Sequence, residues 1–289
     1  MNYILSADWH IRATAPRIRK DEYAMIEFKK IDWILKLATK HKADIIVAGD
    51  IFDAPRCPYW LLIMYIELFK QFKHRIYVVP GQHDLHFHNP DLANTPLGAL
   101  ISADVVEIPN SQEIRGVGWE EEMPKENCEV LVIHTPVTPD KPPFFMEDAI
   151  SAKDMMEELH EYHNLIVTGD YHVSHCHISE DCILCNPGPI MRASKDKIDF
   201  KPRVYLYTNG SIEMKEIPIE KDVFDNEALL EDDRKEYSQE LKELISSFDS
   251  KQDYVQFWDV LQDVIKVSGV TKDVQNILNI VKEKVNGYS

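Results

Sequence analysis

Two short stretches decide the fold that this sequence predicts: DIIVAGDIFD at residues 44–53 and RIYVVPGQHD at residues 75–84. Each contains a run of aliphatic and β-branched residues, which is typical of a strand buried on both faces. Each run then reaches a glycine that is followed by polar side chains. Residues 58–72 between them read as a strongly apolar helix, so the order strand, helix, strand indicates an α/β fold in which helices flank a sheet.

The same alternation extends in both directions from these stretches. Apolar residues recur at helical spacing in residues 21–42, 95–102 and 146–161. Further strands are expected where short aliphatic runs occur, at residues 3–7, 105–108, 112–119, 129–133, 164–168, 182–185, 203–207 and 212–217. Two sheets covered by helices would account for this set of strands.

The sequence changes character near residue 217. From there onward helix-forming and charged residues dominate, and amphipathic helices are expected at residues 228–248 and 254–267. We therefore expect two parts: an α/β domain at residues 1–217 and a helical C-terminal module at residues 218–289.

The composition is that of a globular protein of 289 residues, with 44% hydrophobic and 28% charged residues. Five cysteines, an odd number, favour reduced thiols. The chain has neither an apolar run long enough to span a membrane nor an export signal, so we expect a cytoplasmic protein without a membrane partner. The formal net charge of −17 excludes a broad basic groove. Nucleic acid would have to be held by metal ions, local basic loops or a partner chain, because the overall field repels phosphates.

Five of the expected strands are followed by side chains that bind metals. These side chains are Asp8 and His10, Asp50, the run Gln82-His83-Asp84, His134, and the pair Asp170 and His172. In open α/β sheets, ligand sites gather at the carboxyl ends of the strands. Each short motif taken alone is more often a turn, a helix cap or a core histidine. Their joint occurrence, each behind an apolar strand, predicts a metal site.

The order of these residues resembles the pattern D-x-H, G-D, G-N-H-D, H and G-H-x-H of the calcineurin-like metallophosphoesterase superfamily, over about residues 1–215. Within that superfamily, GDIFDA, VVPGQHD and Asn186-Pro187-Gly188 followed by Arg192 are similar to segments of the SbcD-like DNA-repair nucleases. The resemblance implies a four-layer α/β/β/α sandwich with a C-terminal helical extension. It also implies the nuclease subunit of an SbcCD-like complex in DNA repair, recombination or replication, with exonuclease activity on duplex DNA and endonuclease activity on single strands.

The same resemblance assigns a role to each residue of the predicted site. One divalent ion would be bound by Asp8, His10, Asp50 and His172, and a second by Asp50, Gln82, His134 and Asp170. Asp50 would thus bridge the two ions, and His83, held by Asp84, would be the catalytic histidine that faces the substrate. Two ions that share a carboxylate can clamp a phosphodiester and activate water. The oxygen-rich ligand set favours Mn²⁺, with Mg²⁺ as the alternative.

Three positions depart from the family pattern. Gln82 replaces an asparagine, Asp170 replaces a histidine, and Asp53 stands where many of the nucleases have a second active-site histidine. Glutamine and aspartate both offer an oxygen to a metal, so the site can persist. These departures leave open a catalytically weak scaffold subunit, and the acidic net charge leaves open a small-molecule phosphomonoesterase or a cyclic-nucleotide phosphodiesterase.

Several segments are candidates for contact with partners. The basic residues near the predicted site that are candidates for binding DNA are Arg12, Arg17, Arg19, Lys20 and Arg192. Solvated loops are the alternative explanation of these charges. The apolar helix at residues 58–72 is a candidate for a homodimer interface, and burial in the core is its alternative. The C-terminal helices either dock onto an SbcC-like ATPase, as the resemblance implies, or pack on the catalytic domain.

Overall fold

The computed structural model describes residues 1–124, 127–143, 146 and 148–230. The chain divides into two compact units, Met1–Asn226 and Glu227–Ser289. The strands and helices of the first unit form the fold, and only residues 227–230 of the second are described. The helical module that the sequence predicts therefore lies almost entirely outside the described residues.

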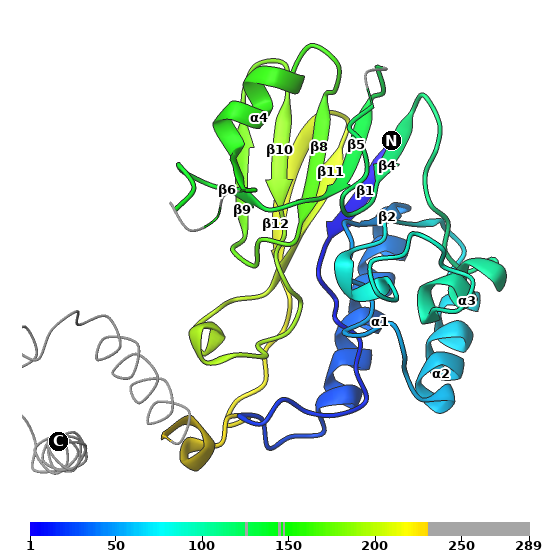
Figure 1. Ribbon diagram of the computed structural model, residues 1–289, viewed down its shortest axis with the longest axis vertical. Helices are drawn as coiled ribbons and strands as arrows, with labels where there is room; N and C mark the ends of the chain where they lie inside the picture. Colours follow the sequence, from blue (N-terminus) through cyan, green and yellow to red (C-terminus); the bar gives the residue numbers. More distant parts are fainter. Residues whose placement is uncertain (125–126, 144–145, 147, 231–289) are drawn as a thin grey trace, which may run out of the picture. The chain divides into compact units, whose positions relative to one another are not determined.

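Two five-stranded sheets form the centre of the first unit (Figure 1). The first sheet has the order β12-β11-β1-β2-β3, with bounds Ser211–Glu216, Arg203–Thr208, Asn2–Ser6, Asp44–Val47 and Ile76–Val78. The second has the order β4-β5-β8-β10-β9, with bounds Ile114–Val117, Val130–His134, Leu165–Gly169, Ile183–Asn186 and His175–Ile178. Strands β1 to β3 run parallel to one another, as do β4, β5, β8 and β10, so their carboxyl ends collect at one edge of each sheet.

Helices cover the outer faces of both sheets, which confirms the predicted α/β/β/α order of layers (Figure 1). The helices are α1 at Tyr23–His41, α2 at Tyr59–Lys70 and α3 at Pro96–Ser102 on the first sheet, and α4 at Ala152–Leu159 on the second. Alternation along each strand produces this arrangement. In β1, Ile4 packs with the helices, whereas Leu5 packs between the sheets against Val132 of β5.

Several elements differ from the sequence prediction. Residues 105–108 form no strand, and only Glu107 makes an isolated bridge to Tyr77. The helix expected at residues 146–161 begins only at Ala152, because Ile150–Ser151 forms β7, which pairs with β6 at Val137–Thr138. Ser151 then caps the helix by accepting a hydrogen bond from the backbone N–H of Asp154. Strand β9 was not predicted, since its sequence HCHI lacks a long aliphatic run.

Helix α2 is apolar on its exposed side as well as its buried side. It buries Leu61 and Tyr65 completely, but Tyr59, Trp60 and Ile63 are 84%, 52% and 58% exposed. The alternative that this helix is simply buried in the core is therefore wrong for half of its surface. Among the residues that the structure describes, no helix has the length and hydrophobicity needed to cross a bilayer.

Candidate metal centre

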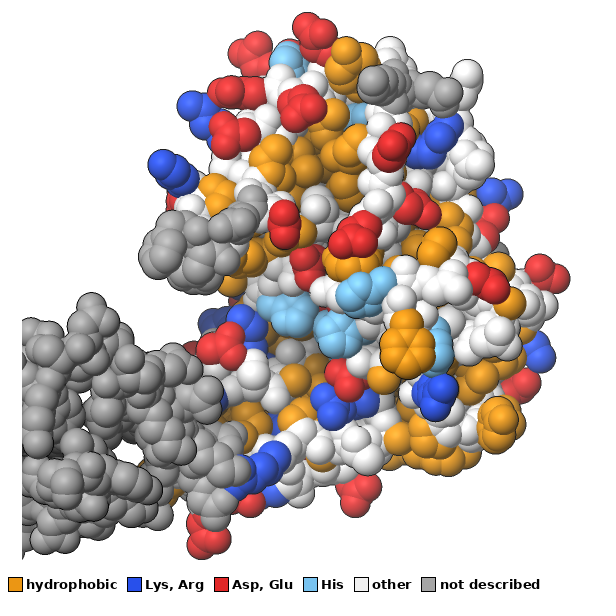
Figure 2. All heavy atoms as spheres, viewed as in Figure 1, with side chains coloured by type: hydrophobic (Ala, Val, Ile, Leu, Met, Phe, Trp, Pro, Cys, Tyr) orange, Lys and Arg blue, Asp and Glu red, His pale blue; other side chains and the backbone are white. Residues whose placement is uncertain are grey.

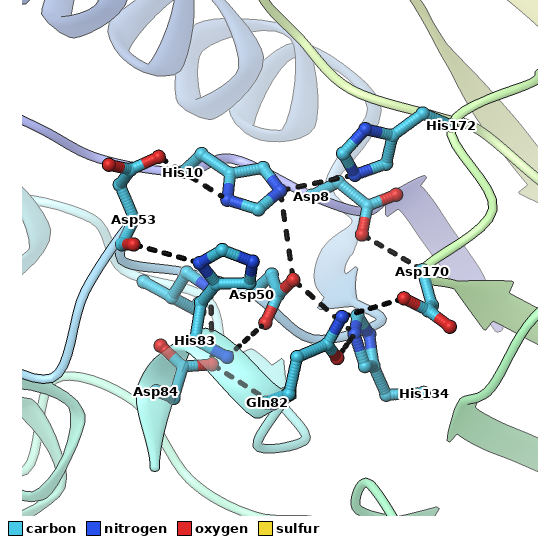
Figure 3. A network of polar contacts seen from close by, with 12 residues as sticks. Asp8, His10, Asp50, Asp53, Gln82, His83, Asp84, His134, Asp170 and His172 are labelled. Atoms are coloured by element: carbon cyan, nitrogen blue, oxygen red, sulfur yellow. Dashed lines mark hydrogen bonds and ion pairs between the residues drawn. The ribbon is translucent and has the colours of Figure 1, made fainter. Parts of the chain in front are cut away.

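The predicted ligands lie together where the two sheets meet, at the carboxyl ends of five strands (Figure 3). From the first sheet come Asp8 and His10 after β1, Asp50 after β2, and Gln82 in the short 3₁₀-helix η1 (Gln82–Asp84) after β3. From the second sheet come His134 at the end of β5, and Asp170 and His172 after β8. The geometry thus brings all seven predicted ligands into one neighbourhood.

Three glycines permit this close approach of the strand ends. A Cβ atom on Gly169 would lie 1.9 Å from the backbone carbonyl oxygen that follows β2, and one on Gly49 would lie 2.0 Å from Nδ1 of His134. A Cβ atom on Gly81 would lie 2.1 Å from a carboxylate oxygen of Asp50. Side chains larger than hydrogen do not fit at these distances. Each glycine directly precedes a predicted ligand, so the G-D and G-Q-H-D segments are steric requirements of the site.

Four of the predicted ligands adopt the left-handed backbone conformation. Their φ angles are 49° for Asp8, 48° for His10, 49° for Asp50 and 74° for Asp170. Each such residue costs about 1–2 kcal/mol, because its Cβ atom crowds the following carbonyl group. Hydrogen bonds between the strand ends hold the conformation, including one from the backbone N–H of His10 to the carbonyl of Asp50 at 2.9 Å. Strain concentrated in this way is typical of functional sites.

Two imidazoles face each other on one side of Asp50. Nε2 of His10 lies 3.2 Å from Nε2 of His172 and 3.6 Å from Oδ2 of Asp50. The ligand atoms of Asp8, His10 and His172 all lie within 4.8 Å of one another. Burial lowers the pKa of His10 to about 3 and also lowers that of His172, so both rings are neutral near pH 7. At this distance, one ring must donate its Nε2 proton to the other, or both must share a cation.

A second set of donors lies on the other side of Asp50. Gln82 donates from Nε2 to Oδ1 of Asp170 at 2.7 Å, and its Oε1 lies 2.8 Å from Nε2 of His134. That nitrogen is 3.5 Å from Oδ2 of Asp50. Nδ1 of His134 donates to the carbonyl oxygen of Ala48 at 2.7 Å, which directs Nε2 toward the centre, as in metal-binding histidines.

The buried carboxylates of this cluster require positive charge nearby. Burial alone would lower the pKa of His134, but the carboxylate of Asp50, 3.5 Å from its Nε2, raises the pKa to about 10. Burial raises the pKa of Asp8 to about 7. The Oδ2 atoms of Asp8 and Asp50 are buried without a hydrogen-bond partner, which is costly for a carboxylate. Divalent cations would compensate both oxygens and displace the proton on His134, so the donor set fits metal binding.

His83 lies beside the centre with an exposed ring. Its Nδ1 lies 2.8 Å from the backbone carbonyl oxygen of Asp53 and therefore carries the proton of that hydrogen bond. Nε2 is thereby left as the nitrogen available to another molecule. The ring meets His10 edge-on, with the ring centroids 4.8 Å apart. The backbone of Asp53 thus orients the histidine to which the sequence assigned a catalytic role.

The expectation that Asp84 holds this histidine is wrong. Its carboxylate is fully buried and accepts hydrogen bonds from the backbone N–H groups of Ile51, Phe52 and Gly81. Asp84 therefore ties the loop after β2 to the loop after β3. This link holds in place the backbone that carries Asp50 and His83. Asp84 therefore affects the site only by positioning these two residues.

A cavity of about 220 Å³ adjoins His10 and His172. Arg12 and Lys197 line it together with apolar side chains, among them Pro189. Nη1 of Arg12 lies 3.2 Å from a carboxylate oxygen of Asp53. Figure 2 shows histidines at the surface near the middle of the face in view, with acidic and basic side chains close to them.

The other basic residues predicted to bind substrate lie elsewhere. Arg19 and Arg192 are 6% and 8% exposed, and both guanidinium groups stack on the ring of Phe224. Arg19 donates to the backbone carbonyl of Arg192 at 2.6 Å. These two arginines therefore stabilise the fold, and neither lines the cavity. Arg17 and Lys20 are exposed in the loop between β1 and α1.

Sequence reasoning missed a buried glutamate beneath the cavity. Glu27 is completely buried in α1 and accepts a hydrogen bond from the backbone N–H of Arg12 at 3.1 Å. Burial raises its pKa well above the ordinary value. The signal in the sequence is its spacing: Tyr23 and Ile31 are four residues away on either side, which places Glu27 on the buried face of the helix.

Asn186 supports the loop that carries the last two ligands. Its amide donates to the backbone carbonyl of Tyr171 at 2.8 Å and accepts from the N–H of Gly188, also at 2.8 Å. Tyr171 stands between the two ligands of that loop, so the N-P-G segment contributes to the centre by orienting them.

The chain is similar to known proteins in family and in fold. Residues 1–202 match the family described as the calcineurin-like phosphoesterase superfamily domain. A Staphylococcus aureus protein proposed to be a 5′-nucleotidase is similar, with 12% identity and a TM-score of 0.50 over 79% of this chain and 56% of that one. An archaeal phosphodiesterase is 10% identical, with a TM-score of 0.44 over 75% of this chain and 100% of its own. The protein TT1561 of Thermus thermophilus is 9% identical, with a TM-score of 0.46 and 75% and 99% coverage. No curated protein matches the sequence.

Proposed function

Because the chain belongs to the calcineurin-like phosphoesterase superfamily, we propose that it hydrolyses phosphodiester bonds of DNA with two divalent ions, preferably Mn²⁺ and alternatively Mg²⁺. We also propose that it serves as the nuclease subunit of an SbcCD-like complex in DNA repair, recombination or replication. The resemblance of GDIFDA, VVPGQHD and the N-P-G segment to the SbcD-like nucleases supports this assignment.

The observation that carries the proposal is the convergence of oxygen and imidazole donors on both sides of Asp50. Two carboxylate oxygens without hydrogen-bond partners, on Asp8 and Asp50, point to missing positive charge. Two divalent ions, when bound, supply charge neutralisation for a phosphodiester and activation of the attacking water. Carboxylate and amide oxygens favour Mn²⁺ or Mg²⁺ over softer metals.

The chain's own residues orient the substrate and move a proton. Nε2 of His83 is the nitrogen left to face the substrate, since Nδ1 is held by the carbonyl of Asp53. When the ring is an imidazolium, Nε2 carries the second proton and gives it to the departing sugar oxygen. Arg12 and Lys197, in the cavity beside His10, bind phosphate oxygens of the substrate. Glu27 holds the backbone of Arg12 in place.

A small phosphoester is the second candidate substrate, and the net charge favours it. The charge of −17 repels a long polyanion. A cyclic nucleotide or a phosphomonoester would avoid this repulsion.

The two candidates are separated by comparing substrates with the Mn²⁺-loaded full chain. The substrates are p-nitrophenyl phosphate, bis-p-nitrophenyl phosphate, a cyclic nucleotide, and labelled single-stranded and duplex DNA. We expect cleavage of the bis-ester and of DNA, with Asp50→Asn as the inactive control for contaminating nucleases. Preference for the monoester or the cyclic nucleotide, with intact DNA, would reject the nuclease and favour the small substrate.

A metal count tests the proposed centre and the scaffold alternative. We expect the chain to bind two Mn²⁺ ions in calorimetry, and Gln82→Asn and Asp170→His, which restore the family pattern, to retain that number. Binding of one ion or none by the natural chain would support a scaffold subunit with a degenerate site.

We further propose a homodimer through the exposed face of α2. Tyr59, Trp60 and Ile63 present an apolar surface there, and such surfaces are common at interfaces. Trp60→Glu should convert a dimer to a monomer in sedimentation analysis, and a chain that is monomeric without the substitution excludes the interface. Docking of an SbcC-like ATPase remains a proposal, because the helices assigned to it lie outside the described residues.

A further inference from the structure

A tight turn follows η1 at residues 86–89. The backbone N–H of Asn89 donates to the carbonyl of His86 at 3.2 Å, and both residues between them are left-handed, with φ angles of 53° at Phe87 and 57° at His88. Two successive left-handed residues define a type I′ turn, which normally carries asparagine or glycine. Phenylalanine is strained in such a turn, because its Cβ atom crowds the following carbonyl group.

Phe87 makes few contacts within the protein that would compensate for this strain. Its side chain is 89% exposed, the highest value among the large hydrophobic residues described, and its one ring contact is edge-on with the neighbouring His86. Packing therefore does not explain an aromatic residue here. A bound molecule that covers the ring would explain it.

The turn is held firmly on both flanks. The ring of His88 packs against Trp119 with the centroids 4.6 Å apart, and Nε2 of His86 lies 3.0 Å from a guanidinium nitrogen of Arg56. Arg56 belongs to the loop after β2, which also carries Asp50. These contacts link the turn that carries Phe87 to the loop that carries Asp50.

A polar recess adjoins the turn. Its volume is about 310 Å³, and the side chains that line it are Arg56, His86, Asn89, Asp91 and Asn94. One guanidinium and two amides offer hydrogen-bond donors there, whereas Asp91 offers the single carboxylate. Oδ1 of Asp91 already accepts from the backbone N–H of Ala93 at 2.9 Å. The recess thus presents more donors than acceptors, which suits a phosphate.

We propose that Phe87 and Arg56 form a subsite for the polynucleotide strand that leads away from the metal centre. An exposed aromatic ring beside a polar recess that contains a guanidinium group matches the two parts of an unpaired nucleotide, the face of the base and the phosphate. Phe87 stacks on a base, and Arg56 binds a phosphate. The inference rests on the proposed cleavage of DNA. It makes that proposal more specific, because such a subsite would favour strands longer than one nucleotide.

The short stretch of chain between His83 and Phe87 limits how far the stacked base can lie from the bond that is cleaved. Phe87 is four residues from His83, so their Cα atoms are at most about 14 Å apart. At about 3.4 Å per phosphate along a strand of duplex spacing, this reach covers no more than about four nucleotides. The subsite therefore acts within the first few nucleotides from the bond that is cleaved.

The experiment measures kcat/KM of the Mn²⁺-loaded full chain on single strands of two to eight nucleotides and on bis-p-nitrophenyl phosphate, which has neither base nor second phosphate. For the natural chain, kcat/KM should rise with length over the first few nucleotides. Phe87→Ala should lower the ratio of kcat/KM on the octanucleotide to that on the bis-ester by about tenfold, as expected for loss of one stacked base. Phe87→Trp should retain the ratio, and Tyr162→Ala, another exposed aromatic, should leave it within about twofold.

Two further variants separate stacking from a structural role. Phe87→Gly relieves the left-handed strain, so it should raise the melting temperature by a few degrees while lowering the ratio as much as Phe87→Ala does. Arg56→Gln should lower cleavage of an all-phosphate strand by about tenfold. On a strand whose second to fourth phosphates are neutral methylphosphonates, the natural chain and Arg56→Gln should act equally.

The outcomes distinguish the subsite from the proposed function. A natural chain that cleaves every length, with an unchanged ratio in Phe87→Ala, overturns the subsite and leaves the nuclease standing. A natural chain that cleaves the bis-ester but no oligonucleotide overturns the nuclease and the subsite together. If Phe87→Ala alters only the oligomeric state and leaves the ratio unchanged, the ring belongs to a protein interface and the subsite is likewise rejected.

Discussion

Single residues of the metal centre are oriented mainly by main-chain atoms. Nδ1 of His134 donates to the carbonyl of Ala48, and Nδ1 of His83 lies on the carbonyl of Asp53. A carbonyl oxygen only accepts hydrogen bonds, so each contact fixes which nitrogen of the ring is protonated. His83 is held by the backbone of residue 53 and not by its side chain. Asp53 can therefore replace the histidine of many nucleases without disturbing the ring of His83.

His83→Leu tests this separation of metal binding from proton transfer. We expect kcat on a phosphodiester to fall by about 10²–10⁴-fold, because the proton donor is lost. The metal content measured by plasma emission should be unchanged, since the proposed ligand set does not include His83. His160→Leu, on the C-terminal end of α4, serves as the control. Loss of a metal from His83→Leu would instead make this histidine a ligand.

Lys30 gives the stability of the protein a defined dependence on pH. Its Nζ lies 3.3 Å from the carbonyl oxygen of Ile190 and 3.7 Å from Glu220, and burial lowers its pKa from 10.5 to about 8. Between these values the unfolded chain binds the proton more tightly than the folded one, so stability rises with pH. Below about pH 8 the lysine is charged in both states, and its contribution is constant.

We therefore expect the free energy of unfolding of the natural chain to rise by about 2–3 kcal/mol relative to that of Lys30→Met between about pH 7 and pH 10. Chemical denaturation at the two pH values measures the difference. Lys36→Met, at an exposed lysine of the same helix, should show no such change. A constant difference between the natural chain and Lys30→Met would show that Lys30 has an ordinary pKa.

The roles of residues that belong to a local motif could be predicted from the sequence. The roles of residues with partners far along the chain could not. Asp8 and His10 could be assigned because a strand precedes them. Arg19 was assigned to substrate because it follows them closely, but it pairs with Asp21 and also contacts Arg192 and Phe224, about two hundred residues away. Long-range pairing of buried charges leaves no periodic pattern in a sequence.

At the scale of elements, the centre depends on how closely the ends of β2 and β8 approach. Val47 of β2 belongs to the first sheet, and Val167 of β8 belongs to the second. Each strand is followed along the chain by one of the predicted ligands. The strands themselves could be predicted from their aliphatic runs. The contact between their ends could not, because it requires the relative position of two sheets.

Gly169→Ala tests that contact. The added methyl group would lie 1.9 Å from the carbonyl oxygen of Ala48, so the two sheets must separate locally. We expect a loss of about 1–3 kcal/mol in unfolding free energy and a loss of about 10–100-fold in Mn²⁺ affinity.

Gly210→Ala is the matched control for Gly169→Ala. Gly210 has a φ of 83° but no atom within 4 Å of the added methyl group, so this variant should lose about 1 kcal/mol and keep its metal affinity. Equal metal affinity in Gly169→Ala and the natural chain would mean that the strand ends tolerate a wider spacing.

The same scale explains which elements the sequence misjudged. Helix α4 was expected to start at residue 146, since apolar spacing continues upstream of it, but β7 uses Ile150 and Ser151 first. Strand β9 was missed because it lies at the edge of its sheet and alternates polar and small residues. Edge strands need only one buried face, so their pattern is weak.

For the whole molecule, charge would set the long-range interaction with the proposed DNA substrate. The chain carries a net charge of −17, and its residues 216–289 contain 17 acidic and 9 basic side chains. Two divalent ions leave the protein strongly negative. We therefore expect attraction for a phosphodiester at the centre and at Arg12, Lys197 and Arg56, while the net charge of the chain repels the strand at longer range.

This distribution predicts an inverted dependence of association on salt. Raising the ionic strength from about 0.01 M to 0.15 M shortens the Debye length from about 30 Å to 8 Å, which screens the distant acidic groups more than the contacts at the centre. The association rate of a labelled single strand, measured by stopped-flow fluorescence, should therefore rise severalfold, whereas it falls for basic DNA-binding proteins. An uncharged peptide nucleic acid of the same sequence should show no change. A rate for DNA that falls with salt would mean that cationic groups near the centre dominate the field at long range, and a dedicated partner would then not be needed to bring DNA to this acidic chain.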